Sequence, residues 1–179
     1  MDDLFAREQI REALLRYARG VDRRDSSLID ACFWPDAVIE HGGMVFDGQH
    51  WGAAIVTTMT KVAKRSRHML SNHLIDVAGV VAYSETYCNA YVLEDAPDGG
   101  EQLLNRGVRY LDQFERRDGE WRSVFRQTVL DWERIEPIVD RPPSLDYVSP
   151  GFTDDPSYRR PLKPLDYDRS VTNGEWILR

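Results

Sequence analysis

The 179-residue sequence has few cysteines and no long apolar run. Its two cysteines, Cys32 and Cys88, are too few for a disulfide framework or a cysteine-rich zinc site, and we expect two buried side chains in a reducing cytoplasm. No stretch approaches the roughly 20 apolar residues of a membrane-spanning helix. The acidic start, Met1-Asp2-Asp3, runs straight into an amphipathic pattern, so no secretory signal is expected.

Basic residues are outnumbered, and several functional motifs are absent. The 23 Lys and Arg residues face 30 Asp and Glu residues, for a net charge of −7. Proteins that bind nucleic acid normally carry a basic surface, so no nucleic-acid partner is expected. The sequence also lacks a glycine-rich phosphate loop, a His-Glu-x-x-His motif and internal repeats. These observations indicate a soluble cytoplasmic domain without a membrane partner.

Proline is scarce until the end of the chain. Seven of the nine prolines lie at position 137 or later, in a region that also keeps its aromatic residues. Disordered tails are usually poor in aromatics. We therefore expect one domain over residues 1–133, and an irregular extension over 134–179 that packs on this domain or on a neighbouring subunit.

The first part of the chain has helical periodicity. Four apolar side chains share one face of a helix expected over residues 3–21: Ile10, Leu14, Tyr17 and Val21. A short second helix is expected from an N-cap at Asp25 or Ser26 to near Trp34. Pro35 should end it, because the residue before a proline avoids the helical conformation.

A small hairpin and a third helix come next, followed by long strands. Short strands at 37–40 and 44–46 flank Gly42-Gly43, a turn signal, and helical character returns over 48–64. Four strands rich in β-branched and aromatic residues are then expected, over 68–77, 80–93, 103–115 and 121–132. Helices first and strands later indicate an α+β fold. We predict a cone-shaped, curved antiparallel sheet wrapped around the N-terminal helices, with an internal pocket.

Histidine and aspartate are the residues best suited to chemistry here. Side chains alternate along a strand, so His68 and Asn72 should share one face and His73 the other. Asp22 follows the first helix, where the helix dipole disfavours a negative charge. A neutral histidine whose other ring nitrogen meets a carboxylate can take a proton from carbon. Glu40-His41 lacks a third ligand at a suitable spacing, so no metal site is expected.

Three segments in the same order resemble the SnoaL-like families of the nuclear-transport-factor-2-like superfamily. They are residues 15–25 with 32–37, then 68–72, and then 110–121, and the resemblance covers roughly residues 5–133. Members similar to scytalone dehydratase and hexachlorocyclohexane dehydrochlorinase have an aspartate after the first helix and a histidine opening the strand after the third. The resemblance implies that Asp22 and His68 form a base dyad that works without a metal or organic cofactor. It also implies a homo-oligomer, a dimer or trimer.

The chain departs from those enzymes beside the dyad. Tyr17 stands where the dehydrochlorinase has a lysine, and Val21 where scytalone dehydratase has a tyrosine. Phe125 aligns with an arginine of the last strand, although Arg126 is adjacent. Tyr17 can donate to a leaving oxygen, so it is a third catalytic candidate. Loss of hydroxide, or formation of a carbonyl product, is favoured over loss of chloride.

Aromatic and apolar side chains suggest a cavity for a flat molecule. The candidate substrate-binding residues are Trp34, Trp51, Met59, Asn72, Tyr87 and Phe125. The leading hypothesis is a cofactor-independent, dehydratase-like lyase that acts on an aromatic or polycyclic small molecule, as in aromatic compound catabolism. An isomerase or cyclase, or a carbon–carbon lyase that releases an aldehyde, would share the proton-abstraction step. A non-catalytic binder or a structural subunit of the same fold is the alternative from another class.

Overall fold

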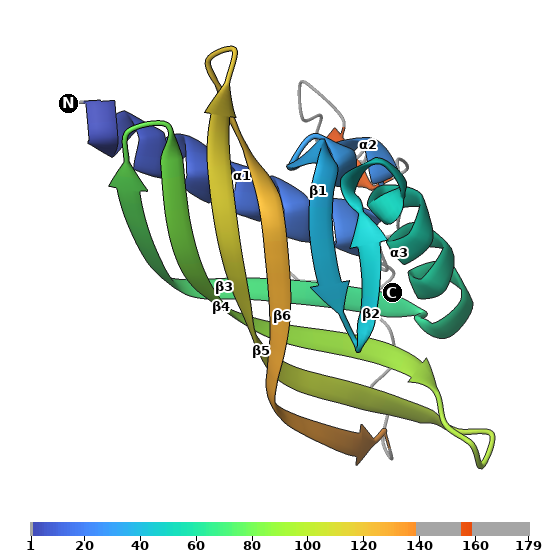
Figure 1. Cartoon of the computed structure of the whole chain (residues 1–179). Helices are drawn as coiled ribbons and strands as arrows, with labels where there is room; N and C mark the ends of the chain where they lie inside the picture. Colours follow the sequence, from blue (N-terminus) through green and yellow to red (C-terminus); the bar gives the residue numbers. More distant parts are fainter. Residues whose placement is uncertain (1, 139–154, 159–179) are drawn as a thin grey trace, which may run out of the picture.

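The computed structural model describes residues 2–138 and 155–158, which form three α-helices, six strands and one short 3-10 helix (Figure 1). The helices are α1 (Asp2–Arg23), α2 (Ser26–Asp30) and α3 (Gly48–Val62). The strands are β1 (Phe33–His41), β2 (Met44–Asp47), β3 (Arg65–Ala78), β4 (Val81–Asp95), β5 (Glu101–Arg117) and β6 (Glu120–Pro137). The 3-10 helix is η2 (Pro156–Tyr158).

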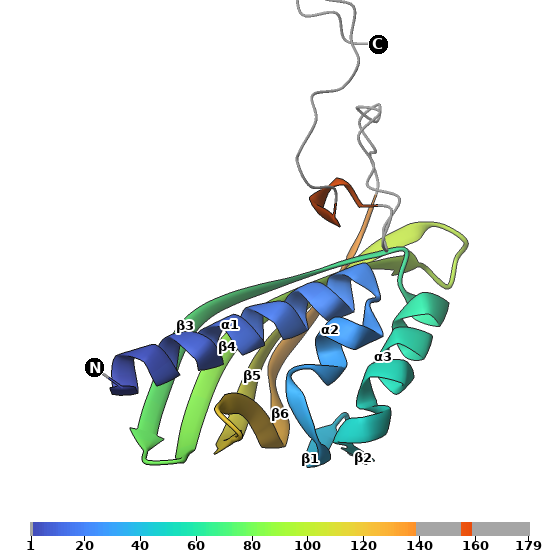
Figure 2. The same cartoon turned by 90° about the horizontal axis from the view of Figure 1, so that it is seen from above.

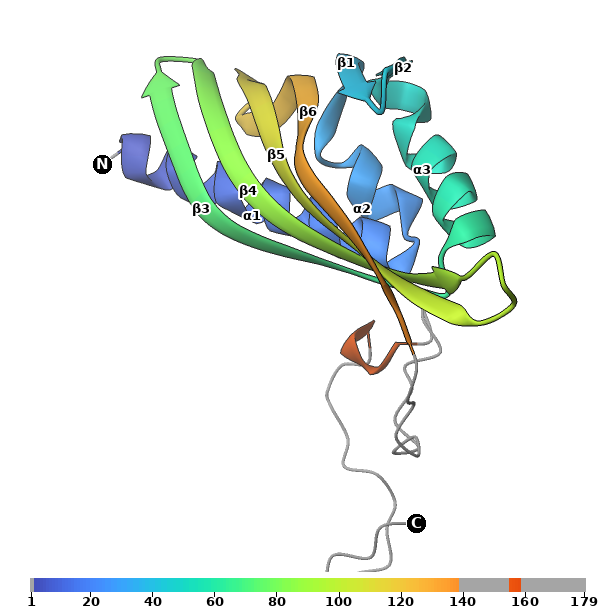
Figure 3. The same ribbon diagram turned by 90° about the horizontal axis from the view of Figure 1, so that it is seen from below.

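The strands form one open, curved sheet in the order β2-β1-β6-β5-β4-β3. Strands β3 to β6 form the predicted antiparallel meander. The sheet is mixed rather than purely antiparallel, because β1 pairs in parallel with β6. The three helices all lie on its concave face, as Figures 2 and 3 show from opposite sides. The α+β cone is therefore confirmed, with one parallel pairing that the sequence pattern did not reveal.

The second helix is shorter than predicted. It ends at Asp30, and Phe33 already pairs with Ser123 of β6. Pairing along β6 thus outweighs the local helical pattern. Pro35 lies within β1, at an irregularity in the register between Phe33 and Val38, where a residue without an N–H does no harm.

The core lies between α1 and the concave face. Ile10 and Leu14 pack on one end of the sheet with Phe114 and Trp121, whereas Tyr17 and Val21 join a second cluster that includes residues of α3. Cys32 and Cys88 are both buried and unbridged, as expected. Burial raises the pKa of Cys32 to about 12 and that of Cys88 to about 11, so both thiols stay protonated near neutral pH.

The convex face is left bare by the helices and carries large apolar side chains. Those of β3 and β4 are Met69, Leu74, Tyr83 and Tyr87. The homo-oligomer and the internal pocket stay predictions. Of the predicted C-terminal extension, residues 139–154 and 159–179 lie outside the described residues, and β6 continues the sheet past residue 133 to Pro137.

Candidate functional site

Asp22 and His68 meet where the end of α1 reaches the beginning of β3. The Oδ1 atom of Asp22 lies 2.7 Å from Nδ1 of His68, and Oδ2 accepts the backbone N–H of His68 at 2.9 Å. Their side chains are 13% and 11% exposed, respectively. An ionised carboxylate only accepts hydrogen bonds, so in the uncharged imidazole the proton lies on Nδ1 and the lone pair on Nε2. Nε2 is therefore the basic atom of the pair.

Local structure at the end of α1 explains how Asp22 is placed. The helix stops because Arg24 adopts a positive φ of 52°, while the N–H of Asp25 donates to the carbonyl of Gly20 at 2.8 Å. The Arg24 guanidinium donates to the carbonyls of Met59 and Ala63 at the end of α3. The ends of α1 and α3 are thus tied together next to the start of β3.

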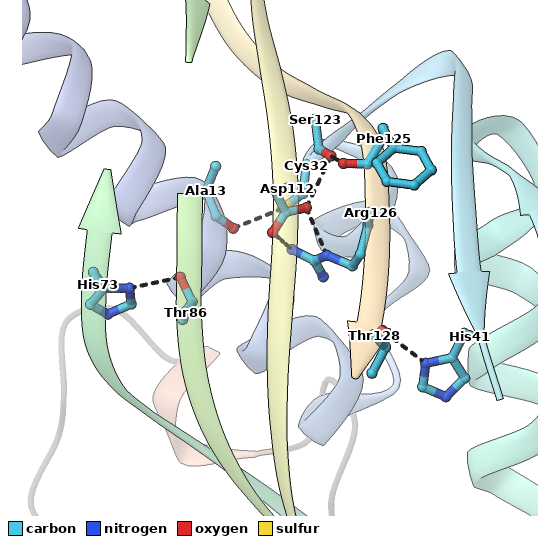
Figure 4. Close-up of polar contacts among 10 residues, drawn as sticks. All are labelled: Ala13, Cys32, His41, His73, Thr86, Asp112, Ser123, Phe125, Arg126 and Thr128. Atoms are coloured by element: carbon cyan, nitrogen blue, oxygen red, sulfur yellow. Dashed lines mark hydrogen bonds and ion pairs between the residues drawn. The ribbon is translucent and has the colours of Figure 1, made fainter. Parts of the chain in front are cut away.

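A β-bulge in β3 changes which residues face the helices. Leu70 lies opposite Cys88 and His73 opposite Thr86, so three steps on β3 match two on β4. His73 therefore returns to the concave face, where its ring meets the hydroxyl of Thr86 (Figure 4). The distance from Nδ1 to Oγ1 is 3.2 Å. Asn72 is exposed in the bulge. The prediction that Asn72 shares the face of His68 and His73 takes the other is wrong.

A second bulge, in β6, decides between Phe125 and Arg126. Ser123 lies opposite Phe114 and Phe125 opposite Gln113, so β6 gains one residue at this point. The shift turns Arg126 into the concave face, where it is buried, and leaves Phe125 only partly buried on the other side (Figure 4). Phe125 is therefore not on the face predicted for it, and Arg126, noted in the sequence only as its neighbour, lies there instead.

Arg126 is held by one carboxylate and by aromatic rings. Its Nε and Nη2 donate to the two oxygens of Asp112 at 2.8 and 3.0 Å, and Ser123 Oγ donates to Asp112 as well, at 3.0 Å. Its guanidinium lies 4.2 Å from the ring centre of Tyr17 and 4.5 Å from that of Tyr110. Burial opposes the charge, but Asp112 together with Tyr17 and Tyr110 outweighs this effect, so the pKa of Arg126 is raised. Nη1 is buried and has no hydrogen-bond partner among the described residues.

Two buried tyrosines lie against this guanidinium. Tyr17 of α1 packs edge-to-face on Phe33 and on Tyr110, with ring centres 5.7 Å apart in each case. Burial raises the pKa of both Tyr17 and Tyr110 above the usual 10.0, so both phenols keep their protons near neutral pH. They are hydrogen-bond donors rather than bases.

His41 is a second imidazole in this neighbourhood, considered in the sequence only as a metal ligand. Its Nδ1 lies 3.3 Å from Thr128 Oγ1, and its ring centre lies 5.2 Å from that of Trp51. Burial, reinforced by the charges of Arg126 and other basic groups that include His68, lowers its pKa to about 4. His41 is thus neutral near neutral pH. No sequence pattern distinguished it, because its burial depends on the β1–β6 pairing.

The neutral His41 predicts a loss of stability in mild acid. Its folded pKa of about 4 lies below its usual 6.5, so the unfolded chain takes up the proton first and stability falls as the pH drops from 6.5 toward 4. We expect its contribution to the free energy of unfolding to fall by about 2–3 kcal/mol over this window. His73, whose pKa burial also lowers, acts in the same direction. Urea unfolding at several pH values measures this slope.

One variant isolates the contribution of His41. His41→Gln should flatten the slope between pH 6.5 and 4 relative to the wild type. An equal slope in wild type and His41→Gln would contradict a buried neutral imidazole.

The other predicted substrate-binding residues divide into two groups. Trp51 and Met59 of α3 are buried in the same cluster as Tyr17. Trp34 lies elsewhere, because its indole donates to the carbonyl of Glu115 on β5 at 3.1 Å. The β5 residue level with His68 is Arg106, nine positions before Glu115. Trp34 is therefore roughly 30 Å along the strand from His68. Tyr87 is 39% exposed on the convex face. The prediction that Trp34 and Tyr87 share a cavity with Trp51 and Met59 is therefore wrong.

Residues 2–138 and 155–158 lack two further features. Within these residues, no helix is long and apolar enough to cross a membrane. Nor do they contain a group of three or more His, Cys, Asp or Glu side chains arranged to hold a metal ion.

Comparison with known proteins places this arrangement in a family. The model of the SnoaL-like domain matches residues 2–127. An uncharacterised protein of Mycobacterium tuberculosis, Rv2910c, is 32% identical over 142 residues, which cover 74% of this chain and 90% of that protein.

Solved structures share the fold. A hexachlorocyclohexane dehydrochlorinase, LinA-type3 from Novosphingobium barchaimii, superposes with a TM-score of 0.67 at 20% identity, over 79% of this chain and 98% of that one. A protein named as a scytalone dehydratase, from Novosphingobium aromaticivorans, gives a TM-score of 0.63 at 18% identity, over 75% and 91% of the two chains. The chain belongs to the SnoaL-like family.

Proposed function

We propose that this protein is a cofactor-independent lyase that removes a proton from carbon and eliminates water from an aromatic or polycyclic small molecule. The observation that carries the proposal is the Asp22–His68 pair, largely shielded from solvent, with a 2.7 Å contact that leaves Nε2 as the base. The dehydrochlorinase and scytalone dehydratase names among the proteins of this fold support an elimination reaction.

The reaction divides between the base and the donors. Nε2 of His68 takes the proton, the electron pair of the broken C–H bond forms a double bond, and the C–O bond breaks. Asp22 stabilises the imidazolium that forms. Tyr17 donates a hydrogen bond to the leaving oxygen. The proton held by His68 passes to that oxygen, so that water departs and the neutral dyad is restored.

Arg126 supplies charge stabilisation in this proposal. Nη1 is the one nitrogen of the guanidinium that does not donate to Asp112, and it has no hydrogen-bond partner among the described residues, so it can hold a substrate oxygen on which negative charge develops. A flat apolar substrate is favoured by the rings of Phe33 and Tyr110, which lie against the guanidinium, and by Trp51 in the same core cluster. A leaving hydroxide fits a hydroxyl donor such as Tyr17 better than a leaving chloride does.

A turnover screen in deuterated water tests the proposal. The purified protein is incubated with a panel of aromatic alcohols, diols and ketones, and the products are weighed by mass spectrometry. A lyase releases a product lighter by one water, whereas an isomerase with the same base yields an unchanged composition with deuterium on carbon. His68→Ala should abolish either signal. A complete absence of elimination and exchange across the panel would overturn the proposed function.

A further inference from the structure

A segment far along the chain lies against the end of the helix that carries Asp22. Residues 155–158, which include η2, contact α1 and the turn after it, although 132 to 139 positions separate the partners in sequence. We call residues 155–158 the latch. The contacts come from both side chains and backbone.

Asp155 makes the buried contact of the latch. It is 4% exposed, and its Oδ2 lies 3.1 Å from Nε of Arg23, the residue that follows Asp22. Its other oxygen accepts the N–H of Ser157 at 2.9 Å, which orders the latch itself. A carboxylate buried this deeply is stable only with partners such as the Arg23 guanidinium and the Ser157 N–H.

Tyr158 makes the second contact. Its hydroxyl donates to Oδ2 of Asp25 at 2.8 Å, and its ring lies 4.5 Å from the guanidinium of Arg19. Arg19 in turn donates to the carbonyl of Ser157 at 3.4 Å. Asp25 also caps α2 through the N–H of Leu28 at 3.3 Å. Tyr158 thus joins the last turn of α1 to the first turn of α2.

The latch holds three residues that surround Asp22 in sequence. Arg19 lies about one turn before Asp22, Arg23 directly after it and Asp25 three positions after it. Helix ends fray, and Asp22 lies in the last turn of α1. A general base needs its partner placed within a fraction of an ångström. We propose that Asp155 and Tyr158 are positioning residues, which hold the end of α1 so that the Asp22 carboxylate stays on His68. The consequence for catalysis rests on the proposed function; the consequence for the helix end does not.

The test removes each contact with a nearly isosteric change, Asp155→Asn and Tyr158→Phe, in the full-length chain. In hydrogen exchange, the amides of residues 20–25 should exchange at least about ten-fold faster in the double variant, because the helix end opens more often. Tyr83→Phe, which removes a hydroxyl from the exposed convex face, is the matched control and should change nothing.

Turnover provides the second readout. With a substrate found in the screen, the double variant should lower kcat by about 10- to 100-fold with little change in KM, because the base is misplaced while substrate contacts remain. Unchanged exchange at residues 20–25 would overturn the latch. Faster exchange with unchanged kcat would show that the latch only stabilises the end of α1, and would overturn its positioning role. Absence of turnover in the wild type would count against the proposed function alone.

Discussion

His68→Ala is expected to lower the turnover number by about 10³- to 10⁴-fold, because it removes the only atom placed to take the substrate proton in our proposal. Asp22→Asn should cost on the order of 10³-fold. The asparagine amide can present its N–H₂ to Nδ1, which favours the tautomer with the proton on Nε2 and so removes the basic lone pair. Steady-state kinetics with a substrate from the screen measures both effects, and circular dichroism shows whether the variants fold.

The chain contains a matched control for this prediction. His50 and Asp47 form another pair with the same 2.7 Å separation between Nδ1 and Oδ1, but their side chains are 72% and 56% exposed at the start of α3. His50→Ala should leave turnover unchanged. A folded His68→Ala variant with wild-type turnover would show that the reaction uses another base.

Asp112→Asn is expected to destabilise the fold by about 3–5 kcal/mol. The Arg126 and Asp112 side chains are 1% and 0% exposed, so removing the negative charge leaves a buried guanidinium without its counter-ion. The rings of Tyr17, Phe33 and Tyr110 offer it only cation–π contacts, which are weaker. Urea unfolding measures the change in the free energy of unfolding.

An exposed ion pair on the same sheet gives the comparison. Arg106 and Glu133 lie 2.6 Å apart, with side chains 44% and 37% exposed. Glu133→Gln should therefore cost less than about 1 kcal/mol, since water screens the pair. A double replacement, Arg126→Met with Asp112→Leu, should recover much of the lost stability but not the turnover. If Asp112→Asn were no more damaging than Glu133→Gln, the buried pair would not hold this part of the core.

Much of the fold was predictable, because periodicity and turn chemistry are local properties. The apolar stripe of α1 and the alternation of β3 to β6 appear directly in the sequence, and Asp118-Gly119 marks its hairpin with positive φ values of 52° and 89°. The pairing of β1 with β6 was not predictable, because it joins residues about 90 positions apart. The same pairing shortened α2.

The candidate site was predictable only in part, for one physical reason. Strict alternation assigns faces correctly until a strand gains a residue, and both β3 and β6 gain one close to the site. The bulge in β3 moved Asn72 outward and His73 inward. The bulge in β6 replaced Phe125 by Arg126. Asp22 lies on α1 and His68 lies before the bulge in β3, so the contact between them did not depend on either bulge.

The proton position on His68 is the most direct test of the central claim, because it needs no substrate. Nitrogen-15 NMR distinguishes the two neutral tautomers of a histidine at a pH where the ring is uncharged. We predict that His68 carries its proton on Nδ1, toward Asp22, with Nε2 bare, and that Asp22→Asn shifts the proton to Nε2. A wild-type His68 protonated on Nε2 would contradict it, since that ring could not accept a proton from a substrate.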